Sequence, residues 1–101
     1  MDENTMKKLL ESVKLSLRLK TEAFDEFEII PLIRACEADL ERVGIDFSDA
    51  PPPLIKQATI LYCKGYFGFG ADAEKFVTSY EKLRDSIALS AKINHAGGNT
   101  K

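Results

Sequence analysis

Apolar side chains recur along the first part of the chain at the spacing of an α-helix. Over residues 5–19 (TMKKLLESVKLSLRL) they fall at i, i+3, i+4, i+7 and i+11, which forms one stripe on one face: Met6, Leu9, Leu10, Val13 and Leu17. Thr5 is a suitable N-cap for this helix. Leu15 and Leu19 lie outside the stripe, so they either widen it or meet a second surface.

A second helix is predicted over residues 25–43, after a polar connector. Its first residues have capping-box spacing, with Asp25 in the role of the Ser or Thr and Glu28 three positions later. Its apolar stripe consists of Ile29, Ile33, Cys36, Leu40 and Val43. Pro31 lies inside this span and removes one backbone hydrogen bond, which predicts a kink or an irregular first turn. Gly44 is a good residue to end the helix.

A third helix, from about Leu54 to Phe67, is apolar around nearly its whole circumference. The connector before it, residues 45–53 (IDFSDAPPP), is stiffened by consecutive prolines, and two glycines follow the helix. Only Gln57 and Lys64 share a polar wedge along it. Because a helix that is apolar on nearly all sides is buried on nearly all sides, we expect this one to be the central rod of the fold.

A fourth helix is predicted after Asp72, a suitable N-cap. Its apolar stripe consists of Ala73, Phe76, Val77, Tyr80, Leu83, Ile87 and Ala91. Residues 94–101 (NHAGGNTK) show no periodicity and are expected to form a flexible tail, disordered in isolation. With no strand pattern, the predicted fold class is all-α: a small bundle of four helices around the central third helix, as one domain of residues 1–93 followed by the tail 94–101.

Some apolar side chains are in excess of what four packed helices of this size can cover. The three other helices are expected to cover the third one, but not these additional residues: Leu15, Leu19, Phe47, Phe67, Phe69 and Leu89. A surplus of apolar surface on a small domain usually indicates self-association or a partner.

Charge is distributed in bands along the 101-residue chain. The net charge is −2, but residues 1–20 carry +2, residues 21–49 carry −7 and residues 50–101 carry +3. Strong nucleic-acid binders usually show a positive excess, which this chain lacks. The charged start of the sequence has no signal-peptide pattern, and no stretch has the length and apolar character of a membrane span, so no membrane association is expected.

No pattern in the sequence predicts catalysis, a cofactor or a metal site. Cys36 and Cys63 lie in apolar stripes without CxxC spacing and are interpreted as buried free thiols, while His95 is the only histidine. The acidic run DEFE at 25–28 is explained by the helix dipole. The stretch GYFGFGAD lacks the strand and the GK[ST] of a phosphate-binding loop and is interpreted as a turn.

The order of these features resembles the small helical head–tail connector proteins of tailed bacteriophages, also called head-completion adaptor or DNA-packaging proteins. The resemblance covers roughly residues 5–93. It rests on LLESVKLSLRL, FEIIPLIRACEADL, a proline-containing loop, LIKQATILYCKGYFG and SYEKLRDSIALS. Members often carry a bulky aromatic–acid–arginine stretch after the third helix, where this chain has FGFGAD instead.

The resemblance implies a structural virion protein at the head–tail junction, present in the host cytoplasm during assembly. Such proteins form a ring, commonly of twelve copies, between the portal and the tail or stopper protein. The ring extends the channel, and DNA passes through it without specific binding. A C-terminal segment often becomes ordered against the portal, which makes the tail residues His95 and Lys101 candidates for docking.

The charge bands suggest which residues join neighbouring copies. A ring uses two different faces of each copy, and we expect acidic Glu37, Asp39 and Glu41 to face basic groups of the next copy. The basic candidates are Lys14, Arg18, Lys82 and Arg84. Phe47 is expected to dock on a neighbouring copy, and Phe67 and Phe69 on a second protein.

Two other functions remain open from the sequence. One is a small DNA-binding packaging or regulatory protein, similar to the small subunit of a terminase, and the other is a helical module that binds a host protein. The first predicts salt-sensitive DNA binding, which a gel-shift assay would detect.

Overall fold

The computed structural model describes the backbone of residues 3–46, 52–67 and 70–100, and of residues 91–100 only the backbone. Within these residues the chain is entirely helical. The elements are α1 (Glu3–Leu17), a π-helical turn η1 (Asp25–Ile29), α2 (Ile30–Arg42), α3 (Pro52–Tyr66), a short 3₁₀ turn η2 (Gly70–Asp72) and α4 (Ala73–Thr100). The predicted all-α bundle of four helices is confirmed. No helix of the described part has both the length and the apolar character needed to cross a bilayer.

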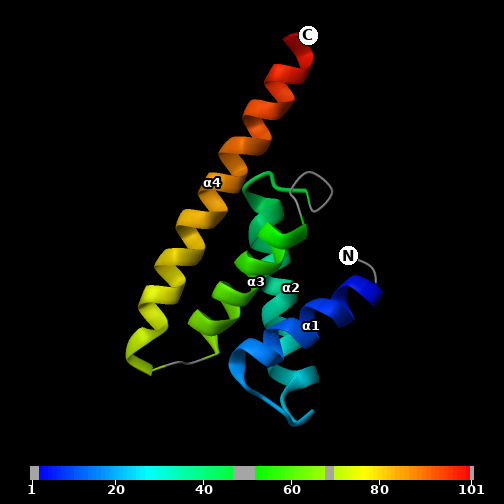
Figure 1. Cartoon of the computed structure of the whole chain (residues 1–101), viewed down its shortest axis with the longest axis vertical. Helices are drawn as coiled ribbons and strands as arrows, with labels where there is room; N and C mark the ends of the chain where they lie inside the picture. The colour runs from blue at the N-terminus through cyan, green and yellow to red at the C-terminus, as the bar shows by residue number, and fades with distance from the viewer. Residues whose placement is uncertain (1–2, 47–51, 68–69, 101) are drawn as a thin grey trace.

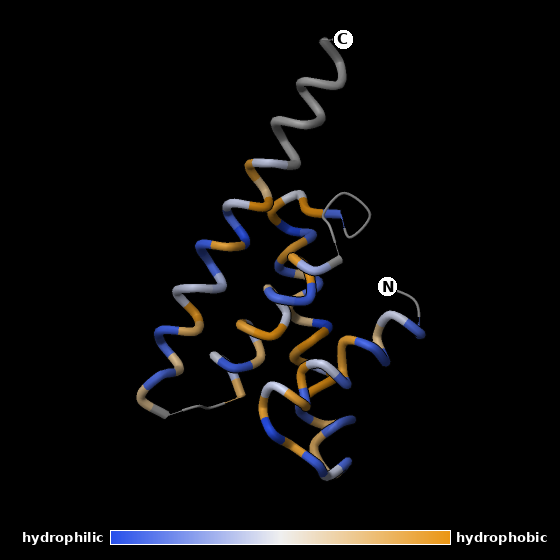
Figure 2. Tube along the Cα trace, in the orientation of Figure 1, coloured by the Kyte–Doolittle hydropathy of each residue, from blue (hydrophilic) through white to orange (hydrophobic). Residues whose placement is uncertain are grey.

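Helix α3 lies at the centre of the molecule, as its sequence predicted. It runs beside α4 on one side and packs against α2 and α1 on the other (Figure 1). Polar and apolar residues alternate around α1 and α4, the pattern of helices with one covered face (Figure 2). The sides of α3 therefore meet three different helices, which explains why apolar residues surround it.

The buried side chains form two clusters that share α3. The α4-side cluster joins α2, α3 and α4 through Cys36, Leu40, Ile45, Ile55, Ala58, Tyr80 and Ile87. The α1-side cluster joins α1, η1, α2 and α3 through Met6, Leu9, Val13, Leu17, Ile29, Ile33 and Cys63. Four of the five residues in the stripe predicted for α1 are members of the second cluster, and the fifth, Leu10, packs against it.

The irregular start of the second helix, predicted from Pro31, is confirmed. The N–H of Ile29 donates to the carbonyl of Phe24 at 2.9 Å, five residues back, so this turn is wider than an α-turn. Pro31 then lies in the first turn of α2, where its missing N–H costs little. The predicted capping box does not form, because the turn begins one residue earlier, at Phe24, and no side chain caps it.

Two helix ends close with the same hydrogen-bond pattern. After α2, the N–H of Gly44 donates to Glu41 and that of Ile45 to Leu40, with Gly44 at φ 88° as predicted for a terminating glycine. After α1, the N–H of Arg18 donates to the carbonyl of Leu15, and Arg18 has φ 59°. A non-glycine residue at this position carries a backbone cost that glycine avoids.

Helices α3 and α4 approach closely at Gly65. A Cβ at this position would lie 2.6 Å from Cγ2 and 3.1 Å from the backbone nitrogen of Val77. From this contact α4 runs antiparallel to α3 and extends past its far end (Figure 1). The backbone of α4 is helical to Thr100, while the side chains from residue 91 onward lie outside the described residues. The flexible tail expected at 94–101 stays a prediction.

Candidate assembly surface

Several large apolar side chains remain on the surface of the described part of the chain. Leu15 on α1 is 81% exposed, Phe27 on η1 is 84% exposed and Leu89 on α4 is 60% exposed. Tyr66 at the end of α3 is 53% exposed. Leu15 and Leu89 were predicted to be in excess of the core and are confirmed as exposed. Leu19, in contrast, packs against the α1-side cluster and widens the stripe of α1.

An open groove of about 330 Å³ lies between the start of α2 and the end of α3. Its lining consists of Phe27, Glu28, Pro31, Leu32, Tyr66 and Phe67. The volume is near the lower limit of ligand pockets, and the groove is large enough for one or two apolar side chains. The surface thus offers a hydrophobic depression beside an acidic segment.

Phe67, predicted to dock on a second protein, is part of this groove and is half-buried in its own chain. It packs against the α1-side cluster, and its ring meets that of Phe24 edge to face with 5.7 Å between centroids. The other predicted docking residues, Phe47, Phe69, His95 and Lys101, lie outside the residues or side chains that the structure describes.

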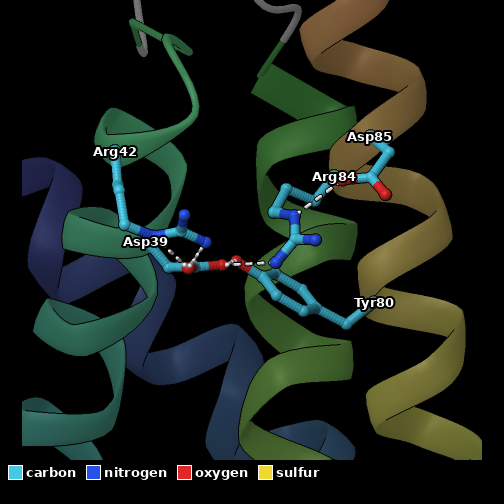
Figure 3. Close-up of polar contacts among 5 residues, drawn as sticks. All are labelled: Asp39, Arg42, Tyr80, Arg84 and Asp85. Carbon is cyan, nitrogen blue, oxygen red and sulfur yellow. Dashed lines mark hydrogen bonds and ion pairs between the residues drawn. The ribbon is translucent and has the colours of Figure 1, made fainter.

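Asp39 is the centre of a polar network that joins α2 to α4 (Figure 3). Its Oδ2 accepts the hydroxyl of Tyr80 at 2.5 Å and Nη1 of Arg84 at 3.1 Å. Its Oδ1 accepts Nη2 of Arg42 at 2.7 Å. Burial disfavours the charged carboxylate, but the hydrogen bonds from Tyr80, Arg42 and Arg84 outweigh burial and hold the pKa of Asp39 below its usual value.

The pKa of Tyr80, another member of this network, is shifted in the opposite direction. Burial, together with the hydrogen bond to Asp39, raises the pKa of Tyr80 far above its usual value, so the phenol is a donor at all working pH values. Nε of Arg84 also binds Oδ1 of Asp85 at 2.9 Å. The sequence placed Asp39 and Arg84 on opposite sides of a contact between copies, whereas the structure brings them together within one chain.

Lys14 also has a partner within its own chain. Its Nζ lies 3.1 Å from Oδ2 of Asp25, and both side chains are less than one-fifth exposed. This pair connects α1 to η1 across the polar connector. Of the other residues predicted to contact a neighbour, Arg18, Glu41 and Lys82 are exposed and Glu37 is partly buried. Their contact across copies is not tested by the structure of a single chain.

The cysteines are free and buried, as the sequence predicted. Burial raises the pKa of both the Cys36 and the Cys63 thiols to about 12, so neither is a thiolate near neutral pH. Among the residues that the structure describes, no three His, Cys, Asp or Glu side chains group in a way that could hold a metal ion.

The sequence reasoning missed the groove. Phe27 belongs to the run DEFE at 25–28, which was explained by its acidic residues alone, and it belonged to no predicted stripe. The available signal was the i, i+4 spacing of Phe27 and Pro31, two apolar residues on a face different from the buried stripe of α2.

One comparison with known proteins identifies a family. A family model described as "Phage connector protein" matches residues 9–94, which is most of the chain. No curated protein and no solved structure matches this chain.

Proposed function

The chain belongs to the phage connector protein family, and from that premise we propose that copies of it form a ring between the portal and the tail or stopper protein of a tailed phage. The ring would extend the channel through which DNA passes. The family is one of structural proteins, which implies that the chain is not an enzyme and acts in the virion together with other virion components.

The observation that carries this proposal is the position of the exposed apolar residues. Leu15, Phe27 and Leu89 lie on three different elements, and each exposes most of its side chain. Single exposed apolar residues are normal, but Phe27 adjoins an open apolar groove as well. A subunit that contacts a neighbour on two sides and other proteins above and below needs such separate surfaces.

The charges of the chain are consistent with a channel protein that does not grip DNA. The net charge is −2, and two of the predicted basic contact residues, Lys14 and Arg84, form ion pairs within the chain. Many free basic side chains would release counterions from phosphates and hold the DNA. Arg18, Glu41 and Lys82 are exposed, and we assign contacts between copies to them together with apolar residues, with Glu37 kept as a predicted contact. Docking of Phe47, Phe69, His95 and Lys101 on neighbouring proteins is part of the same proposal.

Electron microscopy of the purified portal with and without this chain tests the proposal. The expected result is a ring of added density at the tail-facing end of the portal, with the symmetry of twelve copies. Portal images that are identical with and without the chain, at concentrations well above those used for other connectors, would refute it. A gel-shift assay with duplex DNA is the matched control, since salt-sensitive binding would favour the small-terminase alternative instead.

A further inference from the structure

The groove beside η1 combines an apolar interior with an acidic border. Phe27, Pro31, Leu32, Tyr66 and Phe67 supply the apolar lining, and Glu28 is the one acidic residue of the lining. Glu26 is on the same turn and is exposed. Neither Glu26 nor Glu28 forms an ion pair with a described residue, whereas their neighbour Asp25 is neutralised by Lys14. A partner of this groove should therefore present an apolar side chain among basic ones.

The outer face of α1 has this composition. Leu15 lies on the side of α1 opposite to the buried stripe and is the most exposed large aliphatic residue among those described. The exposed basic residues of this helix and its end are Lys7, Lys8 and Arg18, and none of them forms an ion pair with a described residue. The exposed acidic residues of α1 are Glu3 and Glu11, so three exposed basic residues stand against two acidic ones and the balance is +1.

We propose that Leu15 and the basic outer face of α1 in one copy dock into the groove beside η1 of the next copy. This inference rests on the proposed ring and identifies the contact between neighbouring copies that closes it. We call this contact, of the α1 face of one copy with the groove of the next, the joint. Every copy carries both halves, and no residue of α1 lines the groove, so one copy can engage two neighbours at the same time. A contact between two different faces is heterologous and closes into a ring when the rotation between copies is constant.

The ion pair between Lys14 and Asp25 gives this joint a fixed geometry. Lys14 is the neighbour of Leu15 along the chain, and Asp25 belongs to the same turn as Phe27. The 3.1 Å contact between them ties the docking helix to the receiving groove of the same copy. The angle from one joint to the next is thus set inside each subunit, which a ring of defined copy number requires.

Cysteine cross-linking between two single variants tests the joint in the full-length protein. Leu15→Cys and Phe27→Cys are both surface changes, and the native thiols are buried and do not compete. With the portal present, an equimolar mixture treated with a short bis-maleimide should give covalent dimers at least about tenfold above either variant alone. The control mixture of Leu89→Cys with Phe27→Cys should give no such excess.

The outcomes separate this inference from the proposed function. If rings form on the portal but the mixture gives no excess of covalent dimers, the joint is wrong and the ring stands. If Leu15→Cys or Phe27→Cys alone cross-links as well as the mixture, the contact joins like faces and the joint is also wrong. If the wild-type chain adds no density to the portal, the proposed function itself fails.

Aspartate substitutions give a second, independent readout. Leu15→Asp and Phe27→Asp should each weaken self-association on the portal by at least about tenfold, the loss typical of a central contact residue. In a mixture of the two, the intact α1 face of Phe27→Asp should still pair with the intact groove of Leu15→Asp, giving dimers and no ring. Rings from either variant alone, with an unchanged thermal midpoint, would overturn the proposal.

Discussion

Removing the carboxylate of Asp39 should destabilise the fold mainly through Tyr80. Tyr80 is 2% exposed, and its hydroxyl donates to Asp39 at 2.5 Å, so Asp39→Ala leaves a buried donor without its acceptor. An unsatisfied buried polar group costs about 1–3 kcal/mol. Arg84 keeps its bond to Asp85, and the side chain of Arg42 is 64% exposed, so their losses add little.

A double-mutant cycle with Tyr80→Phe isolates this contact. Tyr80→Phe alone should cost about 1 kcal/mol, because Asp39 retains both arginines. The double variant should be more stable than the sum of the two losses by about 1–2 kcal/mol, since neither buried partner is then left alone. Urea unfolding at neutral pH, with an unchanged dependence on denaturant, gives the free energies. Additive losses would refute the assignment of the energy to this hydrogen bond.

The contribution of Asp39 to the free energy of unfolding should depend on pH in a defined direction. The folded pKa of Asp39 lies below its ordinary value of 3.8, so the unfolded chain binds the proton more readily. The contribution of the carboxylate is therefore fully present above that ordinary value and is lost as the pH falls through the folded pKa. The difference in unfolding free energy between the wild type and Asp39→Ala should shrink in this acidic range, and a difference that stays constant would contradict the argument.

Three further changes have expected outcomes. Gly65→Ala should destabilise the protein by about 1–3 kcal/mol because its methyl group would meet Val77 at 2.6 Å, and Val77→Ala in the same chain should recover part of the loss, as measured by urea unfolding. Arg18→Gly should raise the unfolding free energy by about 0.5–1 kcal/mol by relieving the positive φ, and an unchanged or lower thermal midpoint would contradict this. Cys36 and Cys63 should react with a thiol reagent only at the rate of unfolding, and rapid labelling of the native protein would show that they are accessible.

The sequence predicted the features that depend on local pattern. The apolar stripe predicted for α1 packs into the α1-side cluster, because helical spacing alone determines which residues share a face. The central place of α3 followed from its apolar circumference, and an irregular start of the second helix followed from Pro31. These predictions needed no knowledge of how the helices pack.

The partners of the charged residues depend on packing and could not be predicted in this way. Asp39 and Arg84 are 45 residues apart in sequence and meet only because α2 and α4 flank α3 at a particular register. The capping role expected of Asp25 failed for a related reason. Its carboxylate has a basic partner from α1, and the wide turn starts one residue earlier than the spacing implied. The distribution of charge along the sequence identified the acidic segment. It did not show which charged residues form ion pairs within one chain.

The wide turn at Asp25–Ile29 makes the groove beside η1 sensitive to insertions and deletions in the sequence. A turn of this kind holds one residue more than an α-turn, and each residue turns a helix by about 100°. Deleting a single codon ahead of Pro31 would let the chain wind regularly into α2 and would rotate everything before it around the helix axis. The outward direction of Phe27 therefore depends on the number of residues before Pro31, so an insertion or deletion there would redirect this side chain.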